Sequence, residues 1–118
     1  MIYVKMHDML YPATVAGKVT DDEWDGRSSK SITLEMSYGE AATLFVDGLE
    51  WKIAMIEEIP VRDDNGNIID VDIREAEFDN SEYTLAGDIT DHRDGTITAK
   101  MGCLTALEEA YEMLLGGI

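Results

Sequence analysis

The stretch TVAGKVTD, residues 14–21, decides the expected fold, because a near copy of it, TLAGDITD, returns at residues 84–91. Thr, Ala, Gly, Thr and Asp occupy the same places in both copies, and two further positions exchange one apolar residue for another. Each copy is followed by a turn ending in Asp-Gly, by a second alternating stretch (SITLEMS at 31–37, TITAKMG at 96–102) and by a helical pattern. We therefore predict a strand–turn–strand–helix unit that occurs twice.

The remaining strands follow from the alternation of apolar and polar residues, which is typical of strands with one buried face. Residues 2–6 alternate in this way, and residues 49–59 form the longest such stretch. Asn65-Gly66 then predicts a tight hairpin turn, because both residue types tolerate the positive φ angles that such turns need.

The return strand of this hairpin is expected from residue 68. Ile69, Val71 and Ile73 should point inward, whereas the next apolar residue, Ala76, has the opposite parity. Because a strand needs a local irregularity to change the side on which its apolar residues lie, we expect a bulge or bend near Arg74-Glu75.

Two helices are expected, each opened by a capping box in which a Ser or Thr and a Glu three residues later bind each other's backbone amides. The boxes span residues 37–40 and 105–108, and the helices should end at Gly48 and Gly116. Apolar residues at helical spacing give each helix a face that we expect to pack on the core. These faces are Tyr38, Ala41, Ala42 and Phe45 in the first helix, and Leu107, Ala110, Tyr111 and Leu114 in the second.

These elements predict an α+β fold: a mostly antiparallel sheet, or a partly closed barrel, with two short helices. It would be built as a pseudo-duplicated (β)ββα unit plus a long central hairpin. A length of 118 residues indicates one domain over residues 1–118. The pseudo-repeat would cover about 2–48 and 69–116, linked by the strand 49–61.

The composition narrows the classes of partner. Twenty-five acidic residues against nine basic ones give a formal net charge of −16, which repels nucleic acid and anionic membranes. The single cysteine, Cys103, rules out an internal disulfide and is expected to be a small packed residue. The N-terminus lacks the basic start and apolar stretch of a signal peptide, and no apolar run is long enough to span a membrane.

One loop has the spacing of calcium ligands. Asp21, Glu23, Asp25 and Gly26 occupy relative positions 1, 3, 5 and 6 of such a loop. The position that needs a bidentate Glu is Ile32, and the flanks are expected strands, so a structural loop is the favoured interpretation.

Catalytic signatures are weak. His7 and His92 each lie in an expected turn beside aspartates, where a His–Asp pair could serve as a base and its orienting group. No nucleophile motif, phosphate-binding glycine loop or zinc-ligand spacing occurs in the sequence. We therefore expect a non-enzymatic protein without a cofactor or metal.

The most distinctive stretch chemically is 57–82, which holds ten acidic side chains against two arginines. The charges could simply keep an exposed hairpin solvated, or the hairpin could dock on a basic surface. The candidate docking surface consists of Glu57, Glu58, Asp63, Asp64, Asp70, Asp72, Glu75 and Glu77.

Two long stretches resemble small uncharacterised proteins encoded in phages and prophages of gut Firmicutes. They are DDEWDGRSSKSITLEMSYGEAATLFVDGLEW (21–51) and DNSEYTLAGDITDHRDGTITAKMG (79–102). The resemblance rests on similarity over the whole of these stretches and includes no functional motif. It implies a virus-encoded product of the tail or baseplate module, in the bacterial host cytoplasm during assembly or in the virion.

Three hypotheses of function follow. The first is a non-enzymatic phage structural or assembly protein that acts through protein–protein contacts, with a protein partner or as a homo-oligomer. The second is an acidic inhibitor that imitates nucleic acid and occupies a basic groove of a host protein. The third is a calcium-stabilised module.

Overall fold

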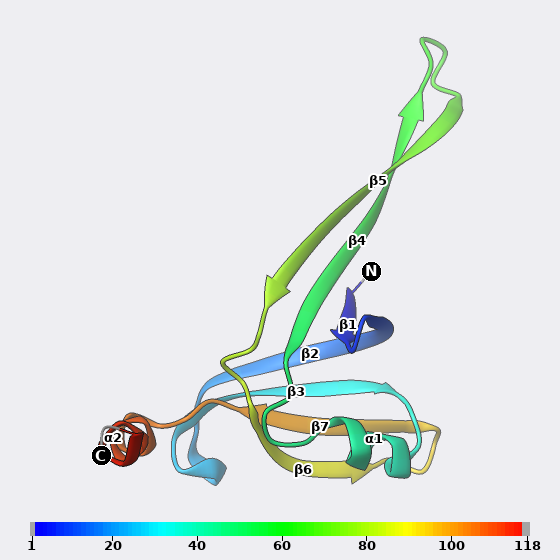
Figure 1. Ribbon diagram of the computed structural model, residues 1–118. Helices are drawn as coiled ribbons and strands as arrows, with labels where there is room; N and C mark the ends of the chain where they lie inside the picture. Colours follow the sequence, from blue (N-terminus) through cyan, green and yellow to red (C-terminus); the bar gives the residue numbers. More distant parts are fainter. Residues whose placement is uncertain (1, 117–118) are drawn as a thin grey trace.

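The computed structural model describes residues 2–116, which form one seven-stranded antiparallel sheet and two helices (Figure 1). The strands are β1 (Ile2–Met6), β2 (Met9–Asp21), β3 (Arg27–Glu35), β4 (Trp51–Arg62), β5 (Ile68–Asp79), β6 (Leu85–Asp91) and β7 (Thr96–Gly102). The helices are α1 (Tyr38–Leu44) and α2 (Ala106–Gly116), and a 3-10 turn, η1, covers Asp22–Trp24. The predicted α+β class is confirmed.

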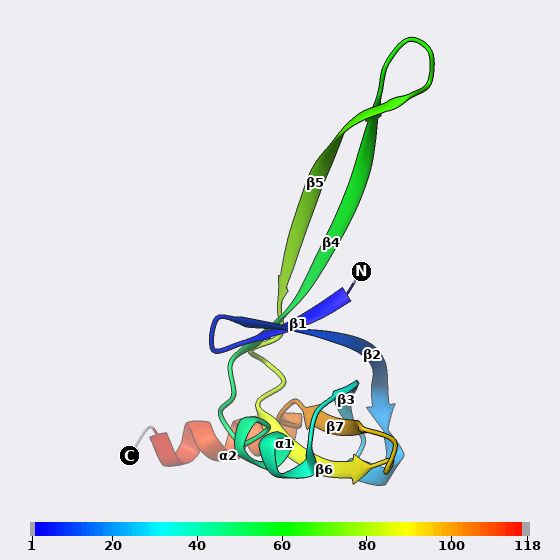
Figure 2. The same cartoon turned by 90° about the vertical axis from the view of Figure 1, so that its right-hand side faces the viewer.

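The sheet has the order β5-β4-β1-β2-β3-β7-β6, so it is open, with β5 and β6 at its edges. The alternative of a partly closed barrel is therefore wrong. β2 joins two parts of the sheet, because Met9–Pro12 pair with β1 whereas Ala13–Asp21 pair with β3. Figure 2 shows the consequence: the lower strands form a body with α1, and the β4–β5 hairpin rises away from it.

The core lies in the body, where the alternation predicted from the sequence is confirmed. Ile32 and Leu34 of β3 and Ile97, Ala99 and Met101 of β7 are all buried. The other buried apolar residues are Val4, Met6, Met36, Ala41, Phe45, Leu49, Trp51 and Ala54. The body therefore buries the apolar side chains of β3 and β7, which are central in the lower part of the sheet.

Helix α1 begins as its sequence predicts and ends earlier. The amide of Glu40 donates to Ser37 Oγ at 3.2 Å, as expected for the cap, and Ala41 is buried. The helix ends at Leu44, and Gly48, with φ of +88°, lies in the turn that follows. The prediction that Gly48 ends this helix is wrong, because the chain turns before reaching it.

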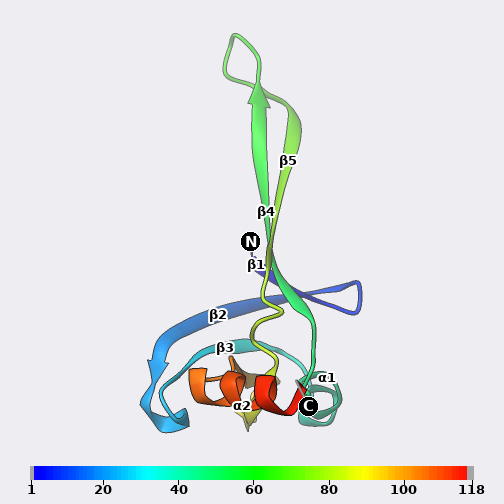
Figure 3. The same cartoon turned by 60° about the vertical axis from the view of Figure 1, so that its left-hand side comes forward.

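The two echoed hairpins lie in the same sheet, but the structure does not confirm a duplicated unit. Their equivalent threonines, Thr33 and Thr98, face each other across β3 and β7. Within the hairpins the registers differ, because Val15 lies opposite Ile32 whereas Leu85 lies opposite Gly102 and not Ile97. The helices differ as well, since α1 contacts β6 and β7, whereas α2 lies to one side of the body in Figure 1 and in front of it in Figure 3.

Candidate functional site

The predicted docking surface lies on an arm that projects from the body (Figure 1). Among the described strands, β4 pairs with β1 only as far as Met55, and from Ile56 onward its one neighbour is β5. We call residues 56–75 the arm. The chain consequently measures 67 × 37 × 26 Å along its principal axes.

All eight predicted acidic residues belong to this hairpin, but they are not equivalent. Glu77, at the base, binds Lys5 Nζ at 3.2 Å and lies 3.6 Å from Lys52 Nζ, and the hydrogen bond from Lys5 lowers the pKa of Glu77. Asp63, at the tip, accepts the amides of Asn65 and Asn67, which lowers the pKa of Asp63. These two carboxylates therefore have structural partners.

The other carboxylates are mostly unengaged. Asp70 accepts the amide of Val71 at 2.8 Å. Among residues 2–116, no hydrogen bond or ion pair engages the remaining five, which are Glu57, Glu58, Asp64, Asp72 and Glu75. The arm therefore presents a negative surface that the protein itself does not neutralise.

The arm also carries exposed apolar side chains on one face. Pro60 lies opposite Val71, and Glu58 lies opposite Ile73, so these four residues project to the same side of the ribbon together with Ile56. Ile73 is 65% exposed and Val71 44% exposed. We call Ile56, Pro60, Val71 and Ile73 the Ile73 face.

The apolar residues change sides along the hairpin without a bulge. At the base, the side that carries Ile53 and Phe78 faces the core, and Ile53 packs against it. Pairing then continues in unbroken register from Lys52 to Val61, and the register shift lies near Arg62. The predicted bulge near Arg74 is therefore wrong: the change of parity moves the apolar residues of β5 onto the opposite face of the arm, whereas Ile59 and Val61 of β4 stay on the side of Ile53.

The prediction that Ile69, Val71 and Ile73 point into the core is wrong for the same reason. All three lie beyond the end of β1, where no described strand or helix covers them. The tip also differs in detail from its prediction, since Gly66 has φ of +81° but Asn65 does not have a positive φ.

A second exposed apolar surface is formed by α2. Leu107 is 82% exposed, and Tyr111 and Leu114 of the same face are 63% and 71% exposed. The prediction that this face packs on the core is wrong. These residues do belong to one helix at the predicted spacing, but spacing alone does not show whether another element covers that face of the helix.

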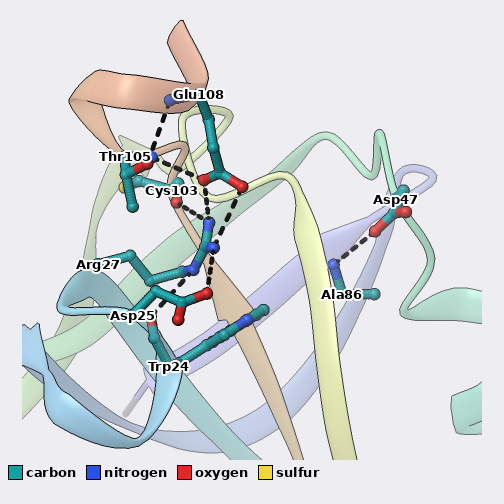
Figure 4. A network of polar contacts seen from close by, with 8 residues as sticks. All are labelled: Trp24, Asp25, Arg27, Asp47, Ala86, Cys103, Thr105 and Glu108. Carbon is teal, nitrogen blue, oxygen red and sulfur yellow. Dashed lines mark hydrogen bonds and ion pairs between the residues drawn. The ribbon is translucent and has the colours of Figure 1, made fainter. Parts of the chain in front are cut away.

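Helix α2 is instead held at its first turn by a polar network (Figure 4). The capping box is complete, because the Thr105 amide donates to Glu108 Oε1 at 2.9 Å and the Glu108 amide donates to Thr105 Oγ1 at 3.2 Å. Arg27, which is buried, donates from Nη1 to Glu108 Oε1 at 2.6 Å and to the Cys103 carbonyl at 2.9 Å. The hydrogen bond from Arg27 lowers the pKa of Glu108 to about 2.

The same network explains Trp24, which stands alone in a polar loop of the sequence. The Arg27 guanidinium lies 5.0 Å from the Trp24 ring centroid, a cation–π contact. The ring lies so close to Gly87 and Gly102 that a Cβ on either would come within 2.8 Å of it. Gly87 also lies at a register shift between Ala86 and Ile89, whereas a Cβ on Gly17, its counterpart in the echo, would meet no atom nearer than 3.9 Å.

The loop with calcium-like spacing is a structural element. Asp21 is buried and accepts from Lys100 Nζ at 2.7 Å and from Ser29 Oγ at 2.9 Å. The hydrogen bond from Lys100 lowers the pKa of Asp21 to about 2. Within residues 2–116 no three His, Cys, Asp or Glu side chains come together as a metal site. The carboxylate of Asp21 is therefore paired with the ammonium group of Lys100.

A cleft of about 780 Å³ is lined by the β1–β2 turn, by residues 46–52 and by the end of β5, and His7 is among its lining residues. Asp79 and Ser81 also line this cleft, and Ser81 Oγ donates to Asp79 Oδ1. His7 is exposed and, among residues 2–116, has no hydrogen-bond partner, so no described group orients the imidazole as a general base.

The other candidate groups are placed differently. His92, in the exposed β6–β7 turn, has its Nε2 atom 2.7 Å from Thr98 Oγ1 and is not among the residues that line the cleft. Burial raises the pKa of the Cys103 thiol, which lowers the fraction present as the nucleophilic thiolate. The features that stand out in this structure are therefore the exposed surfaces of the arm and of α2, which could contact another protein.

Comparison with protein-family models, with curated proteins and with solved structures gives no match to this chain. Among residues 2–116, neither helix has the length and apolar content needed to cross a bilayer. The arm, α2 and the charge of the chain are therefore the features of this molecule that bear on its function.

Proposed function

We propose that the chain is a non-enzymatic structural or assembly protein that acts through protein–protein contacts, and that the arm is its main contact element. The observation that carries this proposal is the Ile73 face. It places apolar side chains from both strands at a distance from the body, where the chain itself cannot bury them. Contiguous exposed apolar surface typically marks an interaction site.

Two further features support a role in assembly. β5 is a long edge strand whose outer side has no described neighbour, and such edges can pair with a strand of another chain. Helix α2 presents Leu107, Tyr111 and Leu114 to solvent while its first turn is fixed to the body. The chain thus offers at least two separate surfaces, as a protein that joins other subunits requires.

The setting that we propose is a phage or prophage particle, in the tail or baseplate region. This part of the proposal is supported by the resemblance of residues 21–51 and 79–102 to phage-encoded proteins. Self-association and binding to another virion protein both fit the proposal.

Gel filtration with light scattering tests the proposed function. The full chain should form a defined oligomer, or a stable complex with a protein encoded beside it. A strict monomer that binds none of the co-encoded virion proteins would contradict the proposal. The Leu107→Ser variant and the Ile73→Ser variant, measured in parallel, would show whether α2 or the arm makes the contact.

The second candidate function is that of an acidic inhibitor that imitates nucleic acid. Asp70 and Asp72 lie two residues apart on one strand, so their carboxylates repeat along one face of the arm. Such an inhibitor should bind basic DNA-binding proteins with an affinity that falls steeply as salt is added. Binding that salt leaves unchanged would exclude this function.

A further inference from the structure

The two faces of the arm differ in chemistry, and the difference suggests what covers them. On the Ile73 face, apolar residues from β4 and β5 form the centre, and Glu58 and Glu75 lie among them. On the opposite face, Asp70 and Asp72 of β5 lie beside Val61 and Ile59 of β4. A partner for the Ile73 face must therefore supply apolar contacts and, interspersed with them, positive charge for Glu58 and Glu75.

We propose that the Ile73 face docks on a different, basic protein, on a surface where apolar residues alternate with lysines or arginines, and not on a second copy of this chain. The inference rests on the proposed function and specifies its partner. Interfaces of this kind commonly combine an apolar centre with a polar, charge-complementary rim.

The charges of the chain argue against a second copy. Two arms packed face to face would bring together like charges, since residues 57–82 carry ten acids and two arginines. Like charges placed opposite each other suppress a wrong partner. An arm-to-arm dimer would therefore oppose its own electrostatics.

The body of a second copy cannot supply the missing positive charge either. Six of the nine basic side chains already have partners. These are Lys5 and Lys52 with Glu77, Arg27 with Glu108, Lys100 with Asp21, Lys30 with Asn80, and Arg62 with the Gly66 carbonyl. Among residues 2–116, the side chains of Lys18, Arg74 and Arg93 have no hydrogen-bond or ion-pair partner, and Arg74 is itself on the arm. Outside the arm, the described basic side chains without an ion pair are therefore Lys18, Lys30 and Arg93, too few to match the arm's acids.

The test uses the full chain and three synthetic peptides of about ten residues, the length of one strand of the arm. One alternates valine and lysine, one alternates serine and lysine, and one alternates valine and glutamate. Binding is followed by NMR titration of backbone amides at low and at high salt. The variant Val71→Ser/Ile73→Ser removes apolar contact without changing the charge. The control variant Leu107→Ser/Tyr111→Ser makes the matching change on α2, which also carries exposed apolar residues beside glutamates.

The expected result is that the valine–lysine peptide shifts amide signals of residues 56–75 and that added salt weakens it. Val71→Ser/Ile73→Ser should weaken it roughly a hundredfold, as expected when two buried aliphatic side chains are lost. The serine–lysine peptide should bind about as weakly as that variant, the valine–glutamate peptide should not bind, and the α2 control should behave as the unchanged chain.

Several outcomes would overturn the inference while leaving the proposed function intact. Equal binding of the serine–lysine and valine–lysine peptides would mean that charge alone suffices. Shifts centred on α2 would place the contact elsewhere. A dimer of the free chain at neutral pH that Ile73→Ser abolishes would make a second copy the occupant. Absence of binding by all three peptides would also overturn it, whereas the proposed function would fail only if the chain also bound no co-encoded protein and stayed monomeric.

Discussion

At the scale of single residues, the two glycines at equivalent places in the echoed stretches have different roles. Gly87 lies under the Trp24 ring, and a Cβ there would come 2.8 Å from Trp24 Cη2 and 3.2 Å from the Lys100 carbonyl oxygen. At Gly17 the nearest atoms would be 3.9 Å away. Sequence identity between the two positions therefore does not imply the same packing.

This difference gives a matched pair of substitutions. Gly87→Ala should lower the free energy of unfolding by about 1–3 kcal/mol, because the ring is also packed against Gly102 and cannot move freely. Gly17→Ala should change it by no more than about 0.5 kcal/mol. Urea unfolding followed by tryptophan fluorescence measures both. Equal effects of the two substitutions would show that Trp24 does not lie on Gly87.

The buried carboxylate of Asp21 makes stability depend on pH. Hydrogen bonds, the largest contribution coming from Lys100, lower its pKa from 3.8 to about 2 in the folded chain. A depressed pKa means that Asp21 stabilises the fold above the unfolded-state pKa and that this contribution is lost as pH falls from about 4 to about 2. Asp21→Asn should therefore lower the urea midpoint at neutral pH, and the difference from the unchanged chain should shrink across that window.

Asp22→Asn is the control for this experiment, because Asp22 is exposed and has no hydrogen-bond or ion-pair partner among residues 2–116. It should leave the urea midpoint nearly unchanged. If the effect of Asp21→Asn were the same at every pH, its cause would be packing and not the charge of the carboxylate.

At the scale of secondary structure, α2 depends on its first turn. Its apolar residues are exposed, and an isolated helix of 11 residues is marginal in water. Glu108→Ala removes the bonds to Arg27 and to the Thr105 amide, so the amide protons of α2 should lose most of their protection against hydrogen exchange. Those of β3 and β7 should keep theirs, because α2 covers neither strand.

Glu109→Ala, one residue further, has the same effect on helix propensity and should leave the protection of α2 nearly unchanged. Acid gives an independent check. Because the pKa of Glu108 is lowered to about 2, its bond to Arg27 should persist at pH 4 and be lost as the pH falls further. Unfolding of the whole sheet by Glu108→Ala would contradict the view that α2 is held only at its start.

Sequence reasoning identified every strand and helix, because alternation, turn residues and capping boxes are local signals. It also identified the buried faces of β3 and β7, where apolar alternation coincides with a central place in the sheet. It failed for the arm and for α2. Ile69, Val71 and Ile73 alternate as core residues do, but alternation shows only that one face is apolar. What covers that face depends on the order of strands in the sheet. β1 pairs with β4 only from Trp51, opposite Met6, to Met55, opposite Ile2, so no part of β1 lies beside the arm.

The eight acidic residues proposed for docking were found because charge density is visible in sequence, and the structure places all of them on one hairpin. The partners of Glu77 could not be foreseen, since Lys5 is 72 residues away along the chain. The apolar part of the candidate surface was mistaken for core. The shift of parity at Ala76 is the signal of it in the sequence, but the same shift also fits a bulge or bend.

At the scale of the whole molecule, the arm determines the shape. The radius of gyration of the Cα atoms is 18.3 Å, whereas a compact chain of this length is expected near about 13.5 Å. The arm is a two-stranded ribbon without a covering layer, and such ribbons are marginal on their own. Its strands nevertheless continue directly from β4 and β5 of the sheet, so the base of the arm is held in register by Lys52–Asp79 and Ile53–Phe78 pairing.

Small-angle X-ray scattering at neutral pH and low concentration should therefore give a radius of gyration near 18.3 Å and an elongated distance distribution, if the chain is monomeric in that sample. A value near the compact expectation would mean that the arm folds back and covers the Ile73 face with the chain's own surface. That result would remove the reason for a partner, since an apolar face already buried needs no other protein. An extended arm in the free chain instead leaves the acidic residues pointing into solvent, where their mutual repulsion opposes folding back and keeps the Ile73 face open for a basic surface.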